Sequence, residues 1–410
     1  MQAIIEKSSR KAARRTRIPV LLIGLAVSLS ACGDLTNGEE GGLRPLDPIL
    51  VAQGKEIFRH DTYGDEVYWT DTLRMHEVIA SVVSPRVALS VGLQVDADVL
   101  PPAVKDAIAA GQVDLDDPAT TVTLLKLNSV IGVHGTVETV AGKDTLVRVG
   151  ISCALCHSRA DSSFAPGIGS RRDGWAATNL NVGAIVALSP AISEELKTIL
   201  RSWGPGRYDP RINHDGLNTP IVIPPAYGLH GVAKETYTGD GPVSYWNAYV
   251  AVTQMHGRGS FQDPRLGSSV TADPDLVTSK LPALAEYQFS LSAPMSPTAP
   301  DASTLARGKA VFNGQGTCST CHIPSQQFTD VGLGRLHAPN VTGMDPAYAA
   351  RTATKRYRTT PLRALWQHAP YFHDGSAATL DSVVTHYDRV LGLKLSPQQR
   401  ADLVAYLGTL

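Results

Sequence analysis

Two short motifs of the form Cys-x-x-Cys-His constrain this chain most: "CALCH" at residues 153–157 and "CSTCH" at residues 318–322. A Cys-x-x-Cys pair alone could form a redox-active disulfide or half of a zinc site. A histidine directly after the second cysteine, found twice, instead predicts haem c, with both thiols bonded to the porphyrin and the imidazole bound to iron. We therefore expect two covalently attached haem c groups. Their predicted attachment residues and proximal ligands are Cys153, Cys156, His157, Cys318, Cys321 and His322.

The fifth cysteine, Cys32, ends the string Leu-Ser-Ala-Cys near the start of the chain. A basic segment and a short apolar run, Ile18–Leu29, precede it in the order of a secretory signal peptide. The Leu-x-x-Cys ending resembles the bacterial lipoprotein cleavage site, whose cysteine is acylated. We expect residues 1–31 to be a lipoprotein signal peptide and residues 32–48 a flexible tether, with a plain signal peptide or an anchoring helix as alternatives. This predicts export to the periplasmic side of a bacterial membrane, and Gly33 is compatible with the outer membrane.

The composition is that of a folded protein, because 43% of the 410 residues are hydrophobic and the formal net charge is −1. A chain of this length can bury two or three cores. Proteins that bind nucleic acid usually carry a strong basic excess, so the charge argues against nucleic acid as the main partner.

The segments around the two haem motifs recur along the chain. "GKEIF" at residues 54–58 and "GKAVF" at residues 308–312 precede the motifs, and a Thr-Pro segment and an Asp-Gly turn follow each motif. The repeat predicts a mainly α fold with two tandem c-type cytochrome domains. The expected boundaries are residues 49–290 for the first domain and residues 291–410 for the second.

The two halves differ in length ahead of the motif. Ninety-nine residues separate the Gly-Lys segment from the first cysteine in the first half, but ten do so in the second. An insertion at about residues 60–148 therefore precedes the first haem motif. We expect it to be mostly helical, with a short strand or two near residues 134–151. It could cover the first haem, recruit a partner or enlarge the core, and the last role needs no special chemistry.

Residues 150–410 resemble the bacterial di-haem cytochrome c peroxidases and the related MauG enzymes. The resemblance rests on the two haem motifs, the late string "TTPLR…APYFHDG…TL" and the closing "LVAYL" helix. It implies that the first haem is the peroxide site, with an open coordination position, and that the second is a six-coordinate electron-transfer site. The family also places calcium between its domains, which implies Ca²⁺ near Asn218 and Thr360.

In this family the distal ligand of the second haem lies twelve residues after the glycine of the His-Asp-Gly turn. It is methionine in the peroxidases and tyrosine in MauG, and here the position is Tyr387. No methionine follows Asp345, so a His/Met haem cannot be built from this helix. An anionic oxygen ligand would lower the reduction potential. The alternatives are that Tyr387 is an ordinary buried aromatic or that His386 binds, with Met344 and His337 as weaker candidates.

The first haem lacks the removable distal histidine that the resemblance implies, because Ser170 stands at that place in "GIGSRRDGW". His214, Met255 and His256 are the alternative distal ligands. If none binds, the first haem is five-coordinate and open to peroxide. If Met255 or His256 binds, that haem is an electron carrier.

A peroxide site also needs an acid or base that moves a proton during O–O cleavage. Glu235 and Asp240 are the candidates, because they lie at the first Asp-Gly turn, and Glu138 is a further carboxylate. Trp246 on the following helix could relay electrons between the haems or simply pack in the core. We expect His373, in the second Asp-Gly turn, to be a hydrogen-bonded residue rather than a ligand.

The main hypothesis is an exported di-haem oxidoreductase that reduces hydrogen peroxide, or uses it to oxidise a partner, with electrons passing through the second haem. A small c-type cytochrome, a cupredoxin or another redox protein would be its partner. The rival is a non-catalytic di-haem electron-transfer cytochrome docked to a membrane or surface redox chain. Ser170 and Tyr387 favour the enzyme, whereas the Met255–His256 pair favours the carrier. A third reading is a haem-bearing module whose insertion binds a larger complex.

Overall fold

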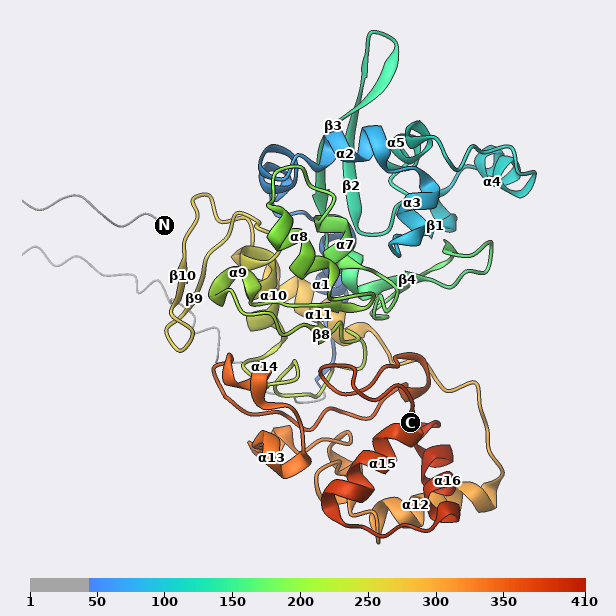
Figure 1. Ribbon diagram of the computed structural model, residues 1–410, viewed down its shortest axis with the longest axis vertical. Helices are drawn as coiled ribbons and strands as arrows, with labels where there is room; N and C mark the ends of the chain where they lie inside the picture. Colours follow the sequence, from blue (N-terminus) through green and yellow to red (C-terminus); the bar gives the residue numbers. More distant parts are fainter. Residues whose placement is uncertain (1–43) are drawn as a thin grey trace, which may run out of the picture. The chain divides into compact units, whose positions relative to one another are not determined.

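The computed structural model describes residues 44–410 (Figure 1). The predicted signal peptide, Cys32 and most of the predicted tether lie outside the described residues. Within residues 44–410, no helix has both the length and the apolar character needed to cross a membrane.

Two pairs of helices, one in each half of the chain, cross at a glycine. The pairs are α1 (Pro48–His60) with α11 (Leu281–Ser290) and α12 (Ala302–Asn313) with α16 (Pro397–Leu407). A Cβ atom at Gly54 of α1 would lie 1.9 Å from a carbonyl oxygen of α11, and one at Gly308 of α12 would lie 2.1 Å from a carbonyl oxygen of α16. Only glycine lets two helix backbones approach this closely.

Each crossing also contains a fully buried phenylalanine, four residues after the glycine. Phe58 meets Tyr287 edge to face with 5.4 Å between ring centroids, and Phe312 meets Tyr406 in the same way at 5.5 Å. The two Gly-Lys-x-x-Phe strings of the sequence therefore occupy equivalent places in the structure. The division into two tandem domains stays a prediction.

The closing helix α16 begins as its Ser-Pro sequence predicts. The Ser396 hydroxyl accepts the backbone N–H of Gln399, and the Gln399 side chain accepts the N–H of Ser396 in return. Pro397 occupies the first turn, where its missing N–H costs nothing. Leu403 and Leu407 are buried, so this face of the helix closes the core.

Residues 60–148 contain short helices and one long hairpin. The helices are η1 (Val67–Thr72, a π-helix), α2 (Met75–Val82), α3 (Pro85–Ser90), η2 (Ala97–Val99), α4 (Pro102–Ala109) and α5 (Pro118–Lys126). β2 (Val133–Val140) and β3 (Lys143–Ile151) pair antiparallel and form the hairpin at the top of Figure 1. The predicted helices and strands are present, although the strands are longer than expected. That this segment is an insertion stays a prediction.

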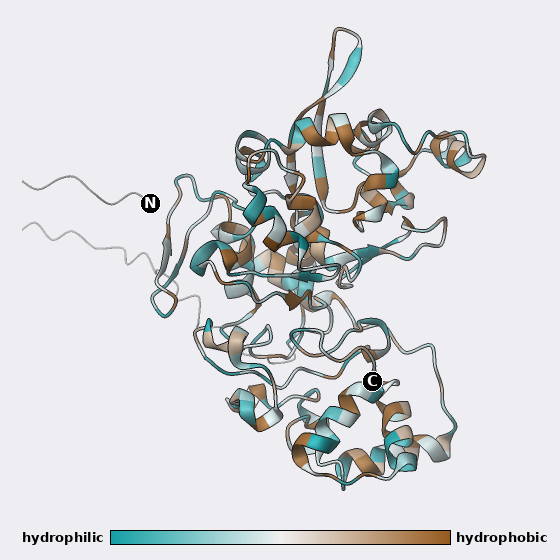
Figure 2. Cartoon of the chain, viewed as in Figure 1, coloured by the Kyte–Doolittle hydropathy of each residue, from teal (hydrophilic) through white to brown (hydrophobic). Residues whose placement is uncertain are grey.

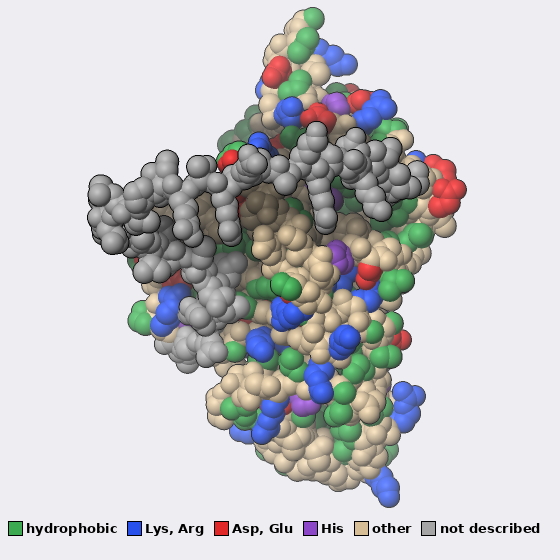
Figure 3. Space-filling model, turned by 90° about the vertical axis from the view of Figure 1, so that its left-hand side faces the viewer, with side chains coloured by type: hydrophobic (Ala, Val, Ile, Leu, Met, Phe, Trp, Pro, Cys, Tyr) green, Lys and Arg blue, Asp and Glu red, His purple; other side chains and the backbone are tan. Residues whose placement is uncertain are grey.

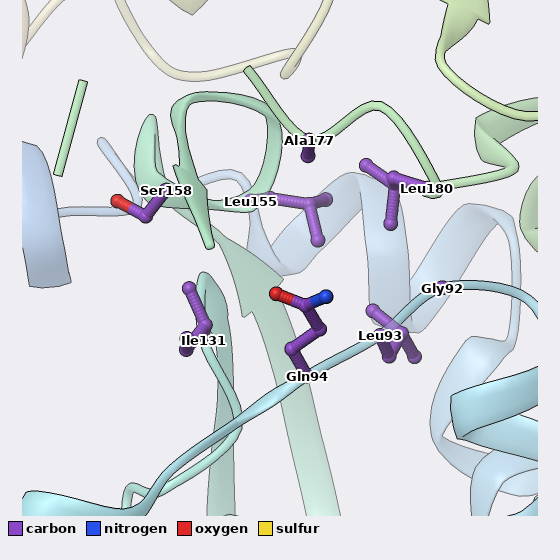
Figure 4. Close-up of a pocket in the computed structure, with 8 residues that line it drawn as sticks. All are labelled: Gly92, Leu93, Gln94, Ile131, Leu155, Ser158, Ala177 and Leu180. Carbon is purple, nitrogen blue, oxygen red and sulfur yellow. The ribbon is translucent and has the colours of Figure 1, made fainter. Parts of the chain in front are cut away.

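The same segment shares a hydrophobic core with the first haem motif. Trp69, Leu125 and Leu146 pack in one cluster with Leu155, which lies between the two cysteines of that motif. Leu155 also lines a small cavity of about 10 Å³, into which Gln94 extends its amide (Figure 4). A space of this size holds at most one water molecule. The segment therefore enlarges the core around the first motif.

The remaining helices are mostly short. They are α6 (Ala154–His157), α7 (Val182–Val186), α8 (Glu194–Arg201), α9 (Ile212–Asp215), α10 (Val243–Thr253), α13 (Pro339–Thr342), α14 (Pro346–Ala350) and α15 (Leu380–Leu391). Figure 2 shows hydrophilic and hydrophobic residues side by side on α12, α15 and α16, as expected for helices with one face in a core.

Strands in residues 44–410 form two-stranded pairs rather than a central sheet. Besides β2–β3, the pairs are β1 (Val95–Asp96) with β5 (Ile168–Gly169), β4 (Ser158–Ala160) with β6 (Arg171–Asp173), β7 (Arg207–Tyr208) with β8 (Ile221–Val222), and β9 (Phe261–Asp263) with β10 (Ser268–Val270). Helices and loops consequently supply most of the core.

Candidate haem sites

The first Cys-x-x-Cys-His motif forms a single helical turn. Cys153 caps α6, and Cys156 and His157 lie within it. Cys153 packs against the apolar cluster that contains Tyr249, whereas Cys156 packs against the cluster of the 60–148 segment. No disulfide joins the two thiols. Both sulfurs are thus held unpaired on one ordered turn, as thioether bonds to haem require.

Both motif histidines direct one ring nitrogen at a backbone carbonyl. His157 Nδ1 lies 3.0 Å from the oxygen of Pro224, and His322 Nδ1 lies 3.0 Å from the oxygen of Phe328. A carbonyl only accepts, so we assign the proton to Nδ1 and leave the Nε2 lone pair for a metal. Burial lowers the pKa of both imidazoles, to about 4 for His157, so the neutral ligating form prevails at pH 7. This shared geometry fits haem iron at both motifs.

The second motif lies closer to solvent than the first. Its Cys321 is half-buried, and burial raises the pKa of the thiol while the nearby guanidinium of Arg335 opposes the rise. Among residues 44–410, one group of at least three side chains could hold a metal ion, namely Cys321, Asp330 and His337. Because Cys321 is a predicted haem-attachment cysteine and His337 is hydrogen-bonded to Asp330 at 3.0 Å, we assign this group to the surroundings of the predicted second haem.

Tyr387 and His386 on α15 have different neighbours. Burial raises the pKa of the Tyr387 phenol to about 12, and the nearby thiols of Cys318 and Cys321 add to the rise. His386 Nε2 instead lies 2.8 Å from the carbonyl oxygen of Thr342. The helix that carries Tyr387 lies beside the second motif, because its Val384 belongs to the cluster that Cys318 packs against, while the His386 ring is engaged by a loop. This favours Tyr387 over His386 as the distal ligand, and ligation itself stays a prediction.

The candidate distal ligands of the first haem lie in three different environments. Met255 is buried within the cluster that Cys153 packs against. The His256 ring stacks on Tyr68 with 3.6 Å between centroids. His214 is exposed, and its Nε2 lies 2.8 Å from a backbone carbonyl of the β9–β10 loop. Ligation by any of the three stays a prediction.

Two positions at which the family pattern would place a ligand carry hydroxyl side chains. Thr253 lies twelve residues after Gly241, the spacing that leads from the second turn to Tyr387, and its hydroxyl donates to the Tyr249 carbonyl at 2.6 Å. Ser170 donates to Asp98 at 3.1 Å. By this count Thr253 corresponds to Tyr387, and the alternative ligands Met255 and His256 lie two and three residues further along the chain.

Glu235 and Asp240 both form ion pairs. Asp240 is buried and accepts from Arg211 Nη2 at 3.3 Å and from the Thr238 hydroxyl at 2.6 Å. Glu235 pairs with Arg358 at 3.1 Å. Each carboxylate is therefore held by a donor from another segment, and a role as catalytic acid or base stays a prediction.

A second buried ion pair joins the first and second halves of the chain. Arg351, at the end of α14, donates from Nη1 to Asp209 and from Nη2 to Asp215, both at 2.7 Å, and its side chain is 4% exposed. Nearby, the Thr354 hydroxyl donates to the Thr238 carbonyl at 2.8 Å. Because one planar guanidinium can bind two carboxylates at once, Arg351 fixes the segment before β8 against α14.

The predicted supporting residues are partly confirmed. His373 is buried, and its Nε2 lies 2.9 Å from the Tyr357 hydroxyl, so it is hydrogen-bonded in the core as predicted. Trp246 stacks on Tyr249 with 5.0 Å between centroids and packs against the same cluster as Cys153. The Asn218 side chain accepts a hydrogen bond from an indole N–H at 2.8 Å. Nothing in residues 44–410 supports the predicted calcium site.

Sequence reasoning missed a group of buried polar atoms near the first motif. The hydroxyls of Tyr63, Tyr208 and Tyr348 and the Nε and Nη1 atoms of Arg211 have no hydrogen-bond partner within the described residues. Such orphaned polar atoms are rare in folded proteins, and their number here fits a site shaped for a polar cofactor. The string "YDPR", which contains two of these residues, was the only local signal.

Comparisons with known proteins agree with the haem geometry. The family model for cytochrome c matches residues 305–410. The methylamine utilization protein MauG of Methylorubrum extorquens is 32% identical over 127 residues, which cover 25% of this chain and 33% of that protein. The cytochrome-c peroxidase IdrP1 of Pseudomonas sp. (strain SCT) is 31% identical over 147 residues, which cover 25% of this chain and 39% of that protein. The chain thus spans about a third to two fifths of the length of these relatives.

Two solved structures give partial matches with low TM-scores. One is a MauG-like protein associated with microbial copper homeostasis, with 20% identity, a TM-score of 0.34 and coverage of 48% of this chain and 75% of that one. The other is the hydrazine synthase of Kuenenia stuttgartiensis, with 19% identity, a TM-score of 0.35 and coverage of 52% and 78%. The cytochrome c match includes the second motif, so this chain binds haem c covalently. Over about a quarter of its length, the chain is similar to MauG and to the cytochrome-c peroxidase IdrP1.

Proposed function

We propose that this chain is a di-haem oxidoreductase that reduces hydrogen peroxide, or uses it to oxidise a partner, with electrons passing through the second haem. The observation that supports the proposal is a difference between the two candidate haem sites. Both motifs prepare a neutral imidazole for iron, but only the second half has a tyrosine, Tyr387, twelve residues after the glycine of its Asp-Gly turn. At the equivalent position of the first half, the Thr253 hydroxyl is used within its own helix.

The two sites would therefore serve different roles. Haem iron with one protein ligand can accept peroxide, whereas iron with two protein ligands exchanges electrons. Around the first motif, Tyr249 and Phe261 form part of a buried apolar cluster that would exclude bulk water. Asp240 and Glu235 remain the proposed proton acceptors, because they are the buried carboxylates beside the first Asp-Gly turn.

Electrons would reach the second haem on its solvent side. The exposed Arg335 lies near Cys321, and the exposed Lys355 and Arg356 precede Tyr357, which bridges to His337. The second half is basic, since residues 291–410 contain eleven Lys and Arg, seven Asp and no Glu. Figure 3 shows several Lys and Arg side chains and few acidic ones across the middle of one face. We therefore propose an acidic-faced redox partner, such as a small c-type cytochrome or a cupredoxin.

For the location of the protein, we propose that Cys32 is acylated and holds the chain at the periplasmic side of a bacterial membrane. The order of basic, apolar and small residues before Cys32 supports this. Mass spectrometry of the N-terminal peptide checks the lipid, and Cys32→Ala should release the protein from the membrane fraction. If Cys32→Ala stays with the membrane, the lipid is not the anchor.

The functional proposal is tested on one preparation of the full-length protein. We expect two covalent haems per chain in the pyridine haemochrome assay, one high-spin and one low-spin ferric signal in low-temperature EPR, and peroxide-dependent oxidation of a reduced c-type cytochrome. Two low-spin haems without turnover would contradict the proposal. A single haem per chain would refute the attachment at Cys153 and Cys156.

A non-catalytic electron-transfer cytochrome is the second candidate, and one observation favours it. Met255 is 4% exposed within the cluster that Cys153 packs against, where its thioether could reach the first haem. The variant Met255→Ala separates the two functions. In the carrier it would convert one low-spin haem to high spin and remove a His/Met band in the near-infrared MCD spectrum. In the enzyme it would leave the spin state of both haems unchanged.

A further inference from the structure

Arg211 is a fully buried arginine whose guanidinium group is mostly unsatisfied. Its side chain has 0% exposure, and Nη2 pairs with Asp240 at 3.3 Å. Its Nε and Nη1 atoms have no hydrogen-bond partner in residues 44–410. A guanidinium offers five N–H donors, and leaving several of them buried without an acceptor is costly and rare.

Two tyrosine hydroxyls near Arg211 also lack a hydrogen-bond partner among the described residues. The hydroxyls of Tyr208, in β7, and Tyr348, in α14, are buried and have no partner among the described residues. Arg351, at the end of α14, binds Asp209 and so holds the helix that carries Tyr348 against the segment that carries Arg211. Burial raises the pKa of Tyr348, and the charge of Arg211 opposes the rise. The Tyr249 ring packs 5.4 Å from the guanidinium carbon, but its own hydroxyl is bound to a backbone carbonyl at 2.8 Å.

The nearby carboxylates of Asp240 and Asp209 do not supply the missing hydrogen-bond acceptors. Asp240 already accepts from the Thr238 hydroxyl at 2.6 Å and from the backbone N–H of Thr354 at 3.3 Å. Asp209 is held by Arg351 at 2.7 Å. The unpartnered donors of Arg211 and the two phenols therefore call for a ligand with acceptor oxygens and negative charge.

The first haem motif lies within reach of the same group. The Arg211 guanidinium lies 5.4 Å from the Tyr249 ring, and Tyr249 belongs to the apolar cluster that Cys153 packs against. Haem c carries two carboxylate side chains, and a carboxylate binds a guanidinium through two parallel hydrogen bonds while still accepting from phenols.

We propose that Arg211, Tyr208 and Tyr348 bind a carboxylate side chain of the first haem. The inference rests on the proposed attachment of that haem at Cys153 and Cys156. It also connects the two halves of the chain, because Tyr348 belongs to α14 whereas Arg211 and Tyr208 belong to the first half. Completion of the first haem site would then depend on the docking of α14.

The proposal predicts an electrostatic effect on one haem. A guanidinium beside the carboxylate offsets its negative charge, which favours the reduced state of the nearby iron. In the holoprotein, Arg211→Gln should lower the midpoint potential of the first haem in spectroelectrochemistry and shift its carboxylate bands in the resonance Raman spectrum. The potential of the second haem should not change. Arg211→Lys keeps the positive charge but cannot form two parallel hydrogen bonds to one carboxylate. It should therefore give a smaller fall in the midpoint potential of the first haem.

Two further variants keep the test decisive. Arg171→Gln is the matched control, because Arg171 is another buried arginine, paired with Asp173 at 3.0 Å outside this group. It should lower stability and leave both potentials unchanged. If Arg211→Gln does not fold, Tyr348→Phe removes one hydroxyl and keeps the ring, and it should lower the first potential by less.

The outcomes separate this inference from the proposed function. Unchanged potentials and Raman bands in both Arg211→Gln and Tyr348→Phe would overturn it, whatever the peroxide activity. Sodium formate, titrated into the wild-type protein at constant ionic strength, tests for a dissociable anion. A saturable shift of the first potential that disappears in Arg211→Gln would show that such an anion fills the site, and the haem assignment would be wrong. A haem count of one would instead mark the failure of the proposed function.

Discussion

The close crossing of α12 and α16 predicts that one added methyl group at Gly308 destabilises the folded protein. In Gly308→Ala, the added Cβ would lie 2.1 Å from the carbonyl oxygen of Asp402 and 2.7 Å from Cβ of Tyr406. Non-bonded carbon atoms are in favourable contact at about 3.5 Å or more. The nearest neighbour is backbone, which cannot rotate away, so the two helices would have to separate by about 1 Å.

The expected loss of stability follows from two opposing effects. Overpacking of a core costs about 1–3 kcal/mol, and a displaced helix belongs near the upper end of that range. Alanine in a helix interior returns about 1 kcal/mol relative to glycine. The net loss of about 2 kcal/mol corresponds to a fall in melting temperature of roughly 8–16 °C if the second half unfolds alone, or roughly 4–8 °C if a larger unit unfolds.

Thermal unfolding followed by far-ultraviolet circular dichroism measures this difference. Gly408→Ala is the matched control, because Gly408 lies at the end of α16 with helical φ and its added Cβ would meet nothing closer than 3.5 Å. Gly54→Ala should resemble Gly308→Ala, since its Cβ would lie 1.9 Å from Ala283 oxygen. If Gly308→Ala melts within about 1 °C of Gly408→Ala, the close crossing and the structural repeat built on it are both wrong.

Four further predictions follow from single sites. Tyr387→Phe should convert the second haem from low to high spin in EPR, and an unchanged low-spin signal would show that another residue binds. Burial raises the pKa of Asp65 to about 9, so the native state holds a proton that the unfolded chain has lost above about pH 4. Stability should therefore fall as pH rises from about 4 towards 9, by up to about 1.4 kcal/mol per pH unit, and chemical denaturation at pH 5 and pH 8 should show a smaller fall in Asp65→Asn. Arg351→Met leaves two carboxylates without their partner and should cost about 3 kcal/mol in the same assay, whereas a loss below about 1 kcal/mol would mean that the pair contributes little. Reversing two charges in Lys355→Glu with Arg356→Glu should slow reduction by an acidic-faced donor about tenfold at low salt in stopped-flow experiments, and a defect that persists at high salt would not be electrostatic.

The features that could be predicted from sequence are those in which chemistry requires fixed residue types at short spacing. A covalent haem needs two cysteines and a histidine within five residues, and a close helix crossing needs a glycine followed by a large apolar side chain one turn later. The start of the closing helix α16 was also predictable from Ser396 and Pro397. In each case the signal is local, because the residues that form the recognisable pattern lie within one or two turns of chain.

The Arg211 group could not be predicted, because its members are brought together only by the fold. Tyr208 and Arg211 lie in one short string, but Asp240 comes from a later turn of the first half and Tyr348 comes from the second half. No periodicity or spacing marks such a group in advance.

The paired helix crossings also determine the order in which the chain can close. The contact from Asp47 to Glu286 beside the first crossing spans 239 residues, and that from Arg307 to Asp402 beside the second spans 95. The longer loop adds only about 0.8 kcal/mol of closure entropy, so the greater length of the first loop costs little free energy of folding. Contacts so distant in sequence form late in folding. Since each haem motif lies inside one of these loops, we expect the cofactor to be attached while the chain is open, and the crossing helices to seal each site afterwards.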